Sequence, residues 1–284
     1  MEWPPPQDWP NRPASRRVYC PPHRWHVQED GEGKTLLLLH GAGGATQTWR
    51  GLFPLLAKRY HVVAPDLPAQ GFTQLGTRQR RGLDEMSEDL VQLCEQEQWR
   101  PYAIVGHSAG AAISLRLSEL LTPKPRAIVG LNAALGEFDG VAGVLFPFLA
   151  KGFSAVPFAP DVLSRLIGTK RRVTQMLNAT GSQIGANGLR SYMRLVRDPA
   201  HVKGTLLMMA QWRLKPLLSR LDHLDTPTLF LVGGNDQTVR PDISRNAAER
   251  MPNAVVKEFP GLGHLAHEEA PGDTADEIHR FVSA

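Results

Sequence analysis

YAIVGHSAGAA, residues 102–112, is the stretch that decides the fold of this 284-residue chain. Its first half is apolar and predicts a buried strand, and the small residues of its second half suit the start of a helix. Ser108 lies at the turn between them, with Gly106 and Gly110 two positions away on either side. A strand that runs through so tight a turn into a helix indicates an α/β protein, with Ser108 at the tip of the turn.

Strand-like and helix-like segments alternate along most of the chain, which predicts a mostly parallel central sheet with helices on both faces. Four predicted strands are near-continuous apolar runs, as in strands that are buried on both faces: Thr35–Leu39, His61–Pro65, Tyr102–Val105 and Arg126–Leu131. The alternation resumes with two more predicted strands, Thr228–Val232 and Ala254–Glu258. The predicted helices are Gln47–Ala57, Asp84–Gln98 with Asp84 as its N-cap, Ala109–Leu121, Pro241–Arg250 and Asp273–Val282.

The amino-terminal 30 residues depart from this alternation. They are rich in Pro and Trp and contain two short extended segments, Arg16–Cys20 and Arg24–Gln28. This pattern predicts an edge hairpin, or an arm laid over the domain.

A second departure covers residues 136–212, which contain several glycines, prolines and phenylalanines. Helical spacing occurs in Val162–Leu166, Gly188–Val196 and Val202–Trp212. We therefore predict one core domain, formed by residues 1–135 and 213–284, with residues 136–212 inserted as a helical cap.

Cysteine content and hydropathy exclude several classes of protein. Cys20 and Cys94 are too few for a disulfide framework, and neither lies in a metal-ligand cluster. The first six residues, Met-Glu-Trp-Pro-Pro-Pro, lack the basic segment and apolar run of a signal peptide. No apolar run reaches the roughly 18–20 residues of a membrane-spanning helix. We therefore expect a cytoplasmic protein that needs neither a metal nor an organic cofactor.

The positive charge of the chain is concentrated in the predicted cap. The whole chain carries +4, but residues 136–215 contain 11 Lys and Arg against 4 Asp and Glu, a net +7, and the remainder carries −3. No nucleic-acid-binding motif accompanies the basic segment, so we expect no nucleic-acid partner. The excess suits anionic ligands or the face of an anionic membrane.

Ser108 needs catalytic partners, because a serine hydroxyl is a poor nucleophile by itself. Asp236 follows a predicted strand and could fix the tautomer of a histidine. His264 lies 28 positions further on, after the last predicted strand. The order Ser, Asp, His and the Gly-x-Ser-x-Gly pattern resemble the α/β-hydrolase superfamily, which predicts that fold and a catalytic triad. His267 is the rival base; otherwise we expect it, with Glu268–Glu269, in a solvated loop or a helix start.

The glycine-rich segment LHGAGG, residues 39–44, also follows a predicted strand. It lacks the last glycine of the dinucleotide-binding pattern, and no Gly-Lys-Ser/Thr follows. Its His-Gly dipeptide resembles the loop that supplies one oxyanion-hole amide in α/β-hydrolases, which makes Ala42 and Ala109 the predicted backbone donors. A purely structural turn is the alternative interpretation.

Other residues near these motifs are candidates for substrate contacts. Asn132 ends the strand before the cap and could line a pocket, whereas His107 could simply pack beside the turn. Asp66 is expected to organise its own loop by local hydrogen bonds. The predicted substrate contacts are His40, His107, Asn132, Phe146 and Trp212.

The cations of the predicted cap allow two interpretations. Lys170–Arg172, with Arg190, Arg194 and Arg197 at helical spacing, could bind the carboxylates of a large apolar molecule. The same residues could instead form a solvated face.

Several segments along nearly the whole chain resemble one branch of the α/β-hydrolase superfamily, the magnesium-chelatase accessory family of bacteriochlorophyll biosynthesis. They are DWPNR (8–12), RWHVQ (24–28), GHSAGAA (106–112), GLNAA (130–134), LMMAQW (207–212) and GLGHLAHEE (261–269). The chain departs from many hydrolases at Ala69-Gln70, where Gly-His is frequent.

The resemblance implies a role in magnesium insertion into protoporphyrin, or in handling its product. The ligand would be a tetrapyrrole, whose flat apolar ring and propionates suit a basic aromatic cap, and magnesium chelatase would be a partner. Two hypotheses follow: a serine hydrolase that cleaves an ester or acyl bond, and a non-catalytic porphyrin carrier or chelatase-assisting protein that uses the same pocket. A basic cap also allows peripheral association with the photosynthetic membrane.

Overall fold

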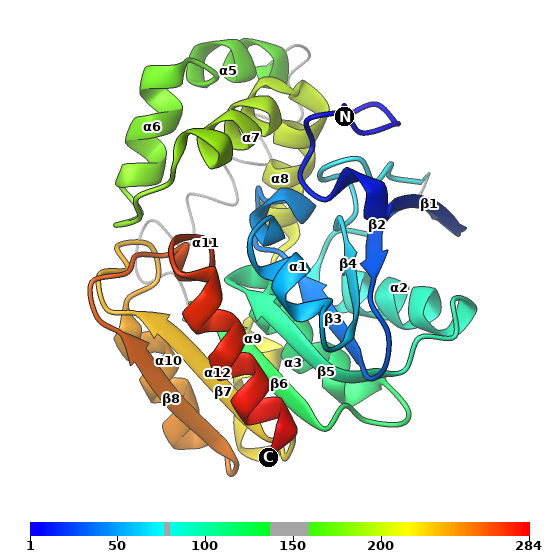
Figure 1. Ribbon diagram of the computed structural model, residues 1–284, viewed down its shortest axis with the longest axis vertical. Helices are drawn as coiled ribbons and strands as arrows, with labels where there is room; N and C mark the ends of the chain where they lie inside the picture. Colours follow the sequence, from blue (N-terminus) through cyan, green and yellow to red (C-terminus); the bar gives the residue numbers. More distant parts are fainter. Residues whose placement is uncertain (77–79, 137–158) are drawn as a thin grey trace.

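The computed structural model describes residues 1–76, 80–136 and 159–284. Its centre is an eight-stranded sheet with the order β1-β2-β4-β3-β5-β6-β7-β8 (Figure 1). Strands β3 to β8 pair in parallel, and β1 and β2 join one edge antiparallel. The strands are β1 Ser15–Cys20, β2 His23–Asp30, β3 Thr35–Leu39, β4 His61–Pro65, β5 Pro101–His107, β6 Ala127–Leu131, β7 Thr228–Gly233 and β8 Ala254–Phe259.

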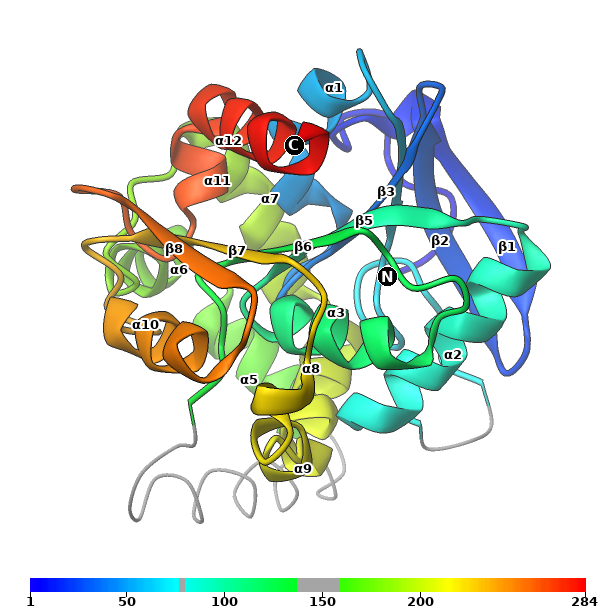
Figure 2. The same ribbon diagram turned by 90° about the horizontal axis from the view of Figure 1, so that it is seen from below.

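Helices cover both faces of this sheet, with α1 and α12 on one face and α2, α3 and α10 on the other (Figure 2). The predicted mostly parallel sheet with helices on both faces is therefore confirmed. The helices of the core are α1 Leu52–Leu56, α2 Leu83–Gln96, α3 Ala109–Leu120, α9 Lys215–Leu218, α10 Pro241–Arg250, α11 Ala266–Glu269 and α12 Pro271–Ser283. Short 3-10 helices lie at η1 Arg12–Ala14, η2 Thr46–Trp49 and η3 Leu221–His223.

The side chains of β3 show why its sequence is an uninterrupted apolar run. Leu36 and Leu38 pack with α1 and α12, whereas Leu37 and Leu39 pack with α2 and α3. All four are at most 1% exposed. Each fully buried leucine stabilises the fold by about 2 kcal/mol. A strand that lies between two helical layers needs apolar side chains on both faces.

The amino-terminal segment extends the sheet. β1 and β2 form an antiparallel hairpin, and β2 pairs antiparallel with β4 from Val27 opposite Pro65 to Asp30 opposite Val62. Trp25 on β2 is completely buried in the larger apolar cluster. The hairpin is thus anchored by the core and forms the sheet edge at β1.

In the described part of the chain, four helices lie between β6 and α9: α5 Ala159–Ile167, α6 Lys170–Asn178, α7 Ala186–Arg197 and α8 Pro199–Gln211. Figure 1 shows them gathered at one end of the molecule, at the opposite end from the C-terminus. They occupy the predicted cap, of which residues 137–158 lie outside the described residues. The limits of the cap at 136 and 212 stay a prediction.

Three local predictions were wrong or incomplete. Gly82, not Asp84, occupies the N-cap of α2, and Asp84 accepts a hydrogen bond from Arg116 Nε at 2.6 Å inside the first turn. The helix predicted at 47–57 is divided into η2 and α1, with Arg50 and Gly51 between them. Helix α6 was not predicted, since Val173 and Leu177 are its only buried apolar residues.

Candidate active site

Ser108 occupies a strained turn between β5 and α3. Its backbone angles are φ 53° and ψ −116°, a region that residues with a side chain rarely adopt. A Cβ atom on Gly106 would lie 2.3 Å from Gly110 O, and one on Gly110 would lie 2.1 Å from Leu39 O. Only glycine at both positions lets the strand and the helix approach so closely. This geometry is that of a nucleophile elbow.

Backbone hydrogen bonds hold this turn against the next strand. Ser108 N donates to Leu131 O at 2.9 Å, and Ser108 O accepts from Ala111 N at 3.0 Å and from Ala134 N at 3.1 Å. The side chain itself is only partly buried. The backbone is therefore fixed while the hydroxyl stays accessible.

Asp236 follows β7, and its carboxylate accepts hydrogen bonds from four donors. Its Oδ2 accepts from His264 Nδ1 at 2.7 Å and from Asn132 Nδ2 at 2.8 Å. Its Oδ1 accepts from the amides of Thr238 at 2.7 Å and Val239 at 2.9 Å. The carboxylate is only 3% exposed, so these contacts allow it little rotational freedom.

His264 follows β8 and is oriented by Asp236. Because Nδ1 donates to the carboxylate, the acceptor nitrogen of the neutral ring is Nε2. Within the described residues no hydrogen bond joins His264 to Ser108 Oγ; the link between them runs through His107, whose Nε2 donates to His264 O at 3.0 Å. Catalytic hydrogen bonds often shorten only when a substrate is bound.

His107 and His267 are buried neighbours of His264. The ring centroid of His107 lies 4.8 Å from that of His264 and 4.5 Å from that of His267. Burial, together with the neighbouring histidines, holds the pKa of His107 well below its usual range. Burial, with Arg50 close by, lowers the pKa of His267 in the same way. His267 Nε2 is bound to Thr48 Oγ1 at 2.8 Å, whereas the histidine that contacts Asp236 is His264.

Glu268 is buried, which contradicts the predicted solvated loop. Its Oε1 accepts from Thr48 Oγ1 at 2.6 Å and from Tyr192 on α7 at 2.5 Å, and its other oxygen contacts Arg50. These partners lie far away in the sequence, so local composition could not show that this segment is covered. The predicted helix start is correct, since α11 begins at Ala266.

His40, a predicted substrate contact, bonds the backbone through both ring nitrogens. Its ring is completely buried. Nδ1 donates to Gly41 O at 2.8 Å, and Nε2 accepts from Leu67 N at 2.9 Å. Both ring nitrogens are therefore used to hold the glycine-rich loop in place.

The amides of Ala42 and Ala109 donate no hydrogen bond within the described part of the chain. A Cβ atom on Gly41 would lie 3.0 Å from Ser108 Cβ, so the glycine-rich loop passes directly beside the serine. The next amide, Gly43 N, is already bound to Gln70 Oε1 at 2.7 Å. Ala42 and Ala109 thus remain the predicted oxyanion donors.

Gln70 is a residue whose role the sequence did not reveal, although its departure from Gly-His was visible. Besides holding Gly43, its Nε2 lies 3.2 Å from Met208 Sδ on α8. Gln70 therefore connects the glycine-rich loop to the cap.

Asp66 organises the start of the loop that carries Gln70. Its oxygens accept from Phe72 N at 2.8 Å, Thr46 N at 2.6 Å and His26 Nδ1 at 2.6 Å. Burial by itself would raise the pKa of Asp66, but His26 and the amide donors hold this pKa below its usual range.

Three further residues were predicted to contact the substrate, and the structure describes the surroundings of two of them. Asn132 is 1% exposed and donates to Asp236, so it positions the carboxylate and does not line an open pocket. Trp212 ends α8 and packs, half-buried, against the larger apolar cluster. Phe146 lies outside the described residues.

The predicted cationic patch is partly used inside the protein. Arg194 forms two hydrogen bonds with Asp8, at 3.1 and 3.2 Å, and holds the pKa of that carboxyl below its usual range. Arg197 donates to Gly168 O at 2.7 Å at the end of α5. In the described residues, Lys170 and Arg171 form no ion pair. Arg190 on α7 bonds only the neutral Asn187 within the described residues, so cations stay available on both α6 and α7.

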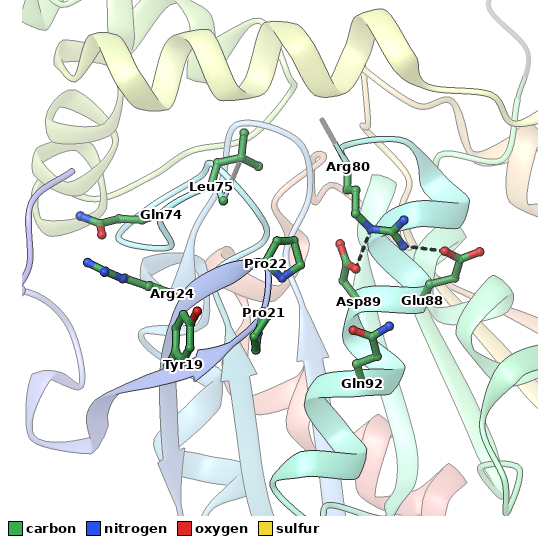
Figure 3. Close-up of a pocket in the computed structure, with 11 residues that line it drawn as sticks. Tyr19, Pro21, Pro22, Arg24, Gln74, Leu75, Arg80, Glu88, Asp89 and Gln92 are labelled. Atoms are coloured by element: carbon green, nitrogen blue, oxygen red, sulfur yellow. Dashed lines mark hydrogen bonds and ion pairs between the residues drawn. The ribbon is translucent and has the colours of Figure 1, made fainter. Parts of the chain in front are cut away.

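A surface cavity of about 870 Å³ lies between the β1–β2 hairpin and α2 (Figure 3). Tyr19, Arg24, Arg80 and Asp89 are among its lining residues, and no residue of the predicted triad is.

Among the residues that the structure describes, no group of three His, Cys, Asp or Glu side chains could hold a metal ion. None of the described helices is long and apolar enough to cross a membrane.

The fold and the turn at Ser108 together define the class of the protein. Residues 34–271 match the sequence profile of the alpha/beta hydrolase fold, and the chain belongs to the α/β-hydrolase family. Within that family, it is 43% identical over 267 residues to the magnesium-chelatase 30 kDa subunit of Rhodobacter capsulatus, with 93% of each chain covered. This similarity confirms the resemblance that the sequence motifs indicated.

Solved structures of more distant relatives have the same fold. Epoxide hydrolase CorEH superimposes with a TM-score of 0.79 at 20% identity, covering 95% of this chain and 98% of its own. A serine hydrolase involved in carbazole degradation gives a TM-score of 0.76 at 22% identity, with coverage of 95% and 98%. At these identities the likeness concerns the fold alone.

Proposed function

We propose that the protein is a serine hydrolase in which Ser108, His264 and Asp236 form the catalytic triad. The observation that supports this most directly is the strained backbone of Ser108, combined with a histidine that a saturated carboxylate orients. Backbone strain persists only where the surrounding structure enforces it, and it concentrates at functional sites. A protein that only carries a ligand gains nothing evident from a strained serine.

The reaction would follow the acyl-enzyme route. Ser108 Oγ attacks the carbonyl carbon of an ester while His264 Nε2 takes the hydroxyl proton, and the amides of Ala42 and Ala109 bind the resulting oxyanion. His264 then gives the proton to the leaving alcohol. Water, activated by the same nitrogen, cleaves the acyl-enzyme and releases the acid. Asp236 orients the ring and stabilises its protonated form during both steps.

The biological setting that we propose is bacteriochlorophyll biosynthesis, at the insertion of magnesium into protoporphyrin. The support is the similarity to the magnesium-chelatase 30 kDa subunit. An ester or acyl derivative of a tetrapyrrole would be the substrate, and a magnesium chelatase component would be the partner. The basic excess of the cap suits the carboxylates of such a ligand.

We also propose a peripheral membrane contact through α5 and α6. Val162, Leu166 and Met176 are large apolar residues that lie exposed on these helices. Lys170 and Arg171 stand on the same pair of helices. Apolar side chains beside cations are the combination that binds an anionic lipid surface.

Two measurements test the proposed activity. A fluorophosphonate probe should label Ser108 in the folded protein, and Ser108→Ala should abolish labelling. In a bacteriochlorophyll-producing strain that lacks the gene, Ser108→Ala should fail to restore pigment, whereas Ser118→Ala, a buried serine on α3 bonded to Leu115 O, should restore it. Full pigment with Ser108→Ala would refute the catalytic role and favour a porphyrin carrier or chelatase-assisting protein.

A further inference from the structure

A short segment of the cap, residues 180–183 between α6 and α7, lies directly on the two loops that carry Asp236 and His264. We refer to this segment as the strap. Thr180 O accepts from Gln237 N and from His264 N, both at 3.2 Å. One carbonyl group of the cap therefore bonds the backbone next to Asp236 and that of His264 itself.

The strap continues this contact at its next residues. Gly181 O accepts from Asn235 Nδ2 at 3.1 Å, on the loop of Asp236. Ser182 Oγ accepts from Leu265 N at 2.8 Å, on the loop of His264. Both catalytic loops are thus bonded to three successive residues of the cap.

The close approach of the strap requires glycine on both sides. Gly181 has a φ of +81°, and a Cβ atom there would lie 2.0 Å from Asn235 O. A Cβ atom on Gly263 would lie 2.3 Å from the carbonyl carbon of Gly181. The two backbones touch with no room for a side chain between them.

One further contact secures the last residue of the strap, and two others hold its surroundings. Gln183 N donates to Glu269 Oε1, while Gly263 N donates to Glu269 Oε2, both at 2.9 Å. On α7, Tyr192 donates to the buried Glu268. Neighbouring carboxylates of α11 therefore hold the strap and α7.

We infer that the strap positions the catalytic pair, with Ser182 as a positioning residue for His264. This inference rests on the proposed hydrolase function. Loops are the mobile parts of a fold, yet Asp236 and His264 must stay within hydrogen-bond reach. Two separate loops keep a fixed spacing when each is bonded to the same third segment, and the strap provides that segment. On this side the cap is part of the catalytic framework.

Ser182→Ala tests the inference, because it removes the acceptor of the buried Leu265 amide and leaves the triad intact. We expect labelling of Ser108 by the fluorophosphonate to slow by about tenfold to a hundredfold, the usual cost of a misplaced catalytic group. Ser182→Thr keeps the hydroxyl and should restore the rate. Ser164→Ala is the matched control: Ser164 is a buried serine of α5 whose hydroxyl, among the described residues, bonds only Asp161 O, so labelling should not change.

A second readout does not depend on activity. The proton between His264 Nδ1 and Asp236 should give a low-field NMR resonance, assigned by its loss in Asp236→Asn. Ser182→Ala should broaden or remove this resonance at temperatures where the protein stays folded. Labelling at the wild-type rate with an unchanged resonance would overturn the inference. If wild-type Ser108 does not label, the proposed function fails, and the resonance alone then decides on the strap.

Discussion

The turn at Ser108 is controlled by distances between backbone atoms. Gly110 sits where a methyl group would meet Leu39 O and His40 O, at 2.1 and 2.7 Å. These oxygens belong to the end of β3 and cannot move aside without disturbing the sheet. Adding a single methyl group at Gly110 would therefore push α3, which presents Ser108, away from the end of β3.

Gly110→Ala should consequently destabilise the protein by about 1–3 kcal/mol, the usual cost of overpacking, and should displace Ser108. Urea unfolding would measure the free energy, and fluorophosphonate labelling would report the displacement. Gly272→Ala is the control, because nothing lies within 4 Å of the added methyl group on α12. That variant should be neutral or more stable. Equal stabilities for the two variants would contradict the steric argument.

The triad candidates could be predicted from the sequence, whereas the residues that position them could not. Ser108, Asp236 and His264 each follow an apolar strand in a motif that their chemistry requires. Asn132 and Ser182 act through single hydrogen bonds to residues more than 80 positions away, and no local pattern marks such a contact. The His-Gly motif at His40 does not reveal that both ring nitrogens bond the backbone.

At the scale of elements, predictions succeeded where burial sets a clear period. The strands in the middle of the sheet are mostly apolar on both faces, and the strand positions agree with the predicted ranges to within two residues or so. Helix α6 was missed because it lies at the surface of the cap and buries only Val173 and Leu177. Its basic start, Lys170–Arg172, carries no apolar period that could reveal a helix.

A buried histidine, His201, bonds helix α8 to two loops of the core. His201 Nδ1 accepts from Gly71 N at 3.0 Å, and Nε2 donates to Gly43 O at 3.1 Å. Burial lowers the pKa of His201 to about 4, so the folded protein keeps this ring neutral. Between about pH 6.5 and 4 the unfolded chain binds a proton at this position that the folded chain does not.

This difference predicts that the contribution of His201 to stability is complete above about pH 6.5 and is lost as the pH falls towards 4, by about 1.4 kcal/mol per pH unit. Urea unfolding at several pH values should show a shallower acid dependence in His201→Gln than in the wild type. The slope of the unfolding free energy against pH should not vanish in this variant, because other buried histidines also contribute to it. His223→Gln, at a side chain that is 78% exposed, should leave the slope unchanged. Identical slopes for wild type and His201→Gln would refute the prediction.

For the whole molecule, the decisive feature is the separation of charge between the cap and the core. Residues 136–215 carry a net +7, and the rest of the chain carries −3. Arg194 forms a surface ion pair with Asp8, and Arg197 donates to a backbone carbonyl. Lys170 and Arg171 on α6 form no ion pair within the described residues, and Val162, Leu166 and Met176 are exposed on α5 and α6, so the cap end is the part of the molecule that we expect to meet an anionic surface.

Replacing Val162, Leu166 and Met176 together by serine should therefore weaken binding to phosphatidylglycerol vesicles by tenfold or more, because their side chains are 48–55% exposed and free to enter the interface. Co-sedimentation measures this affinity. Lys170→Glu with Arg171→Glu should weaken binding to a similar degree and reduce its salt dependence. Val255→Ser is the control, since Val255 is 53% exposed on β8, outside the cap. Equal binding of the serine variant and the wild type, or wild-type binding to phosphatidylcholine vesicles as strong as to anionic ones, would refute the membrane contact and leave the face to an acidic protein partner.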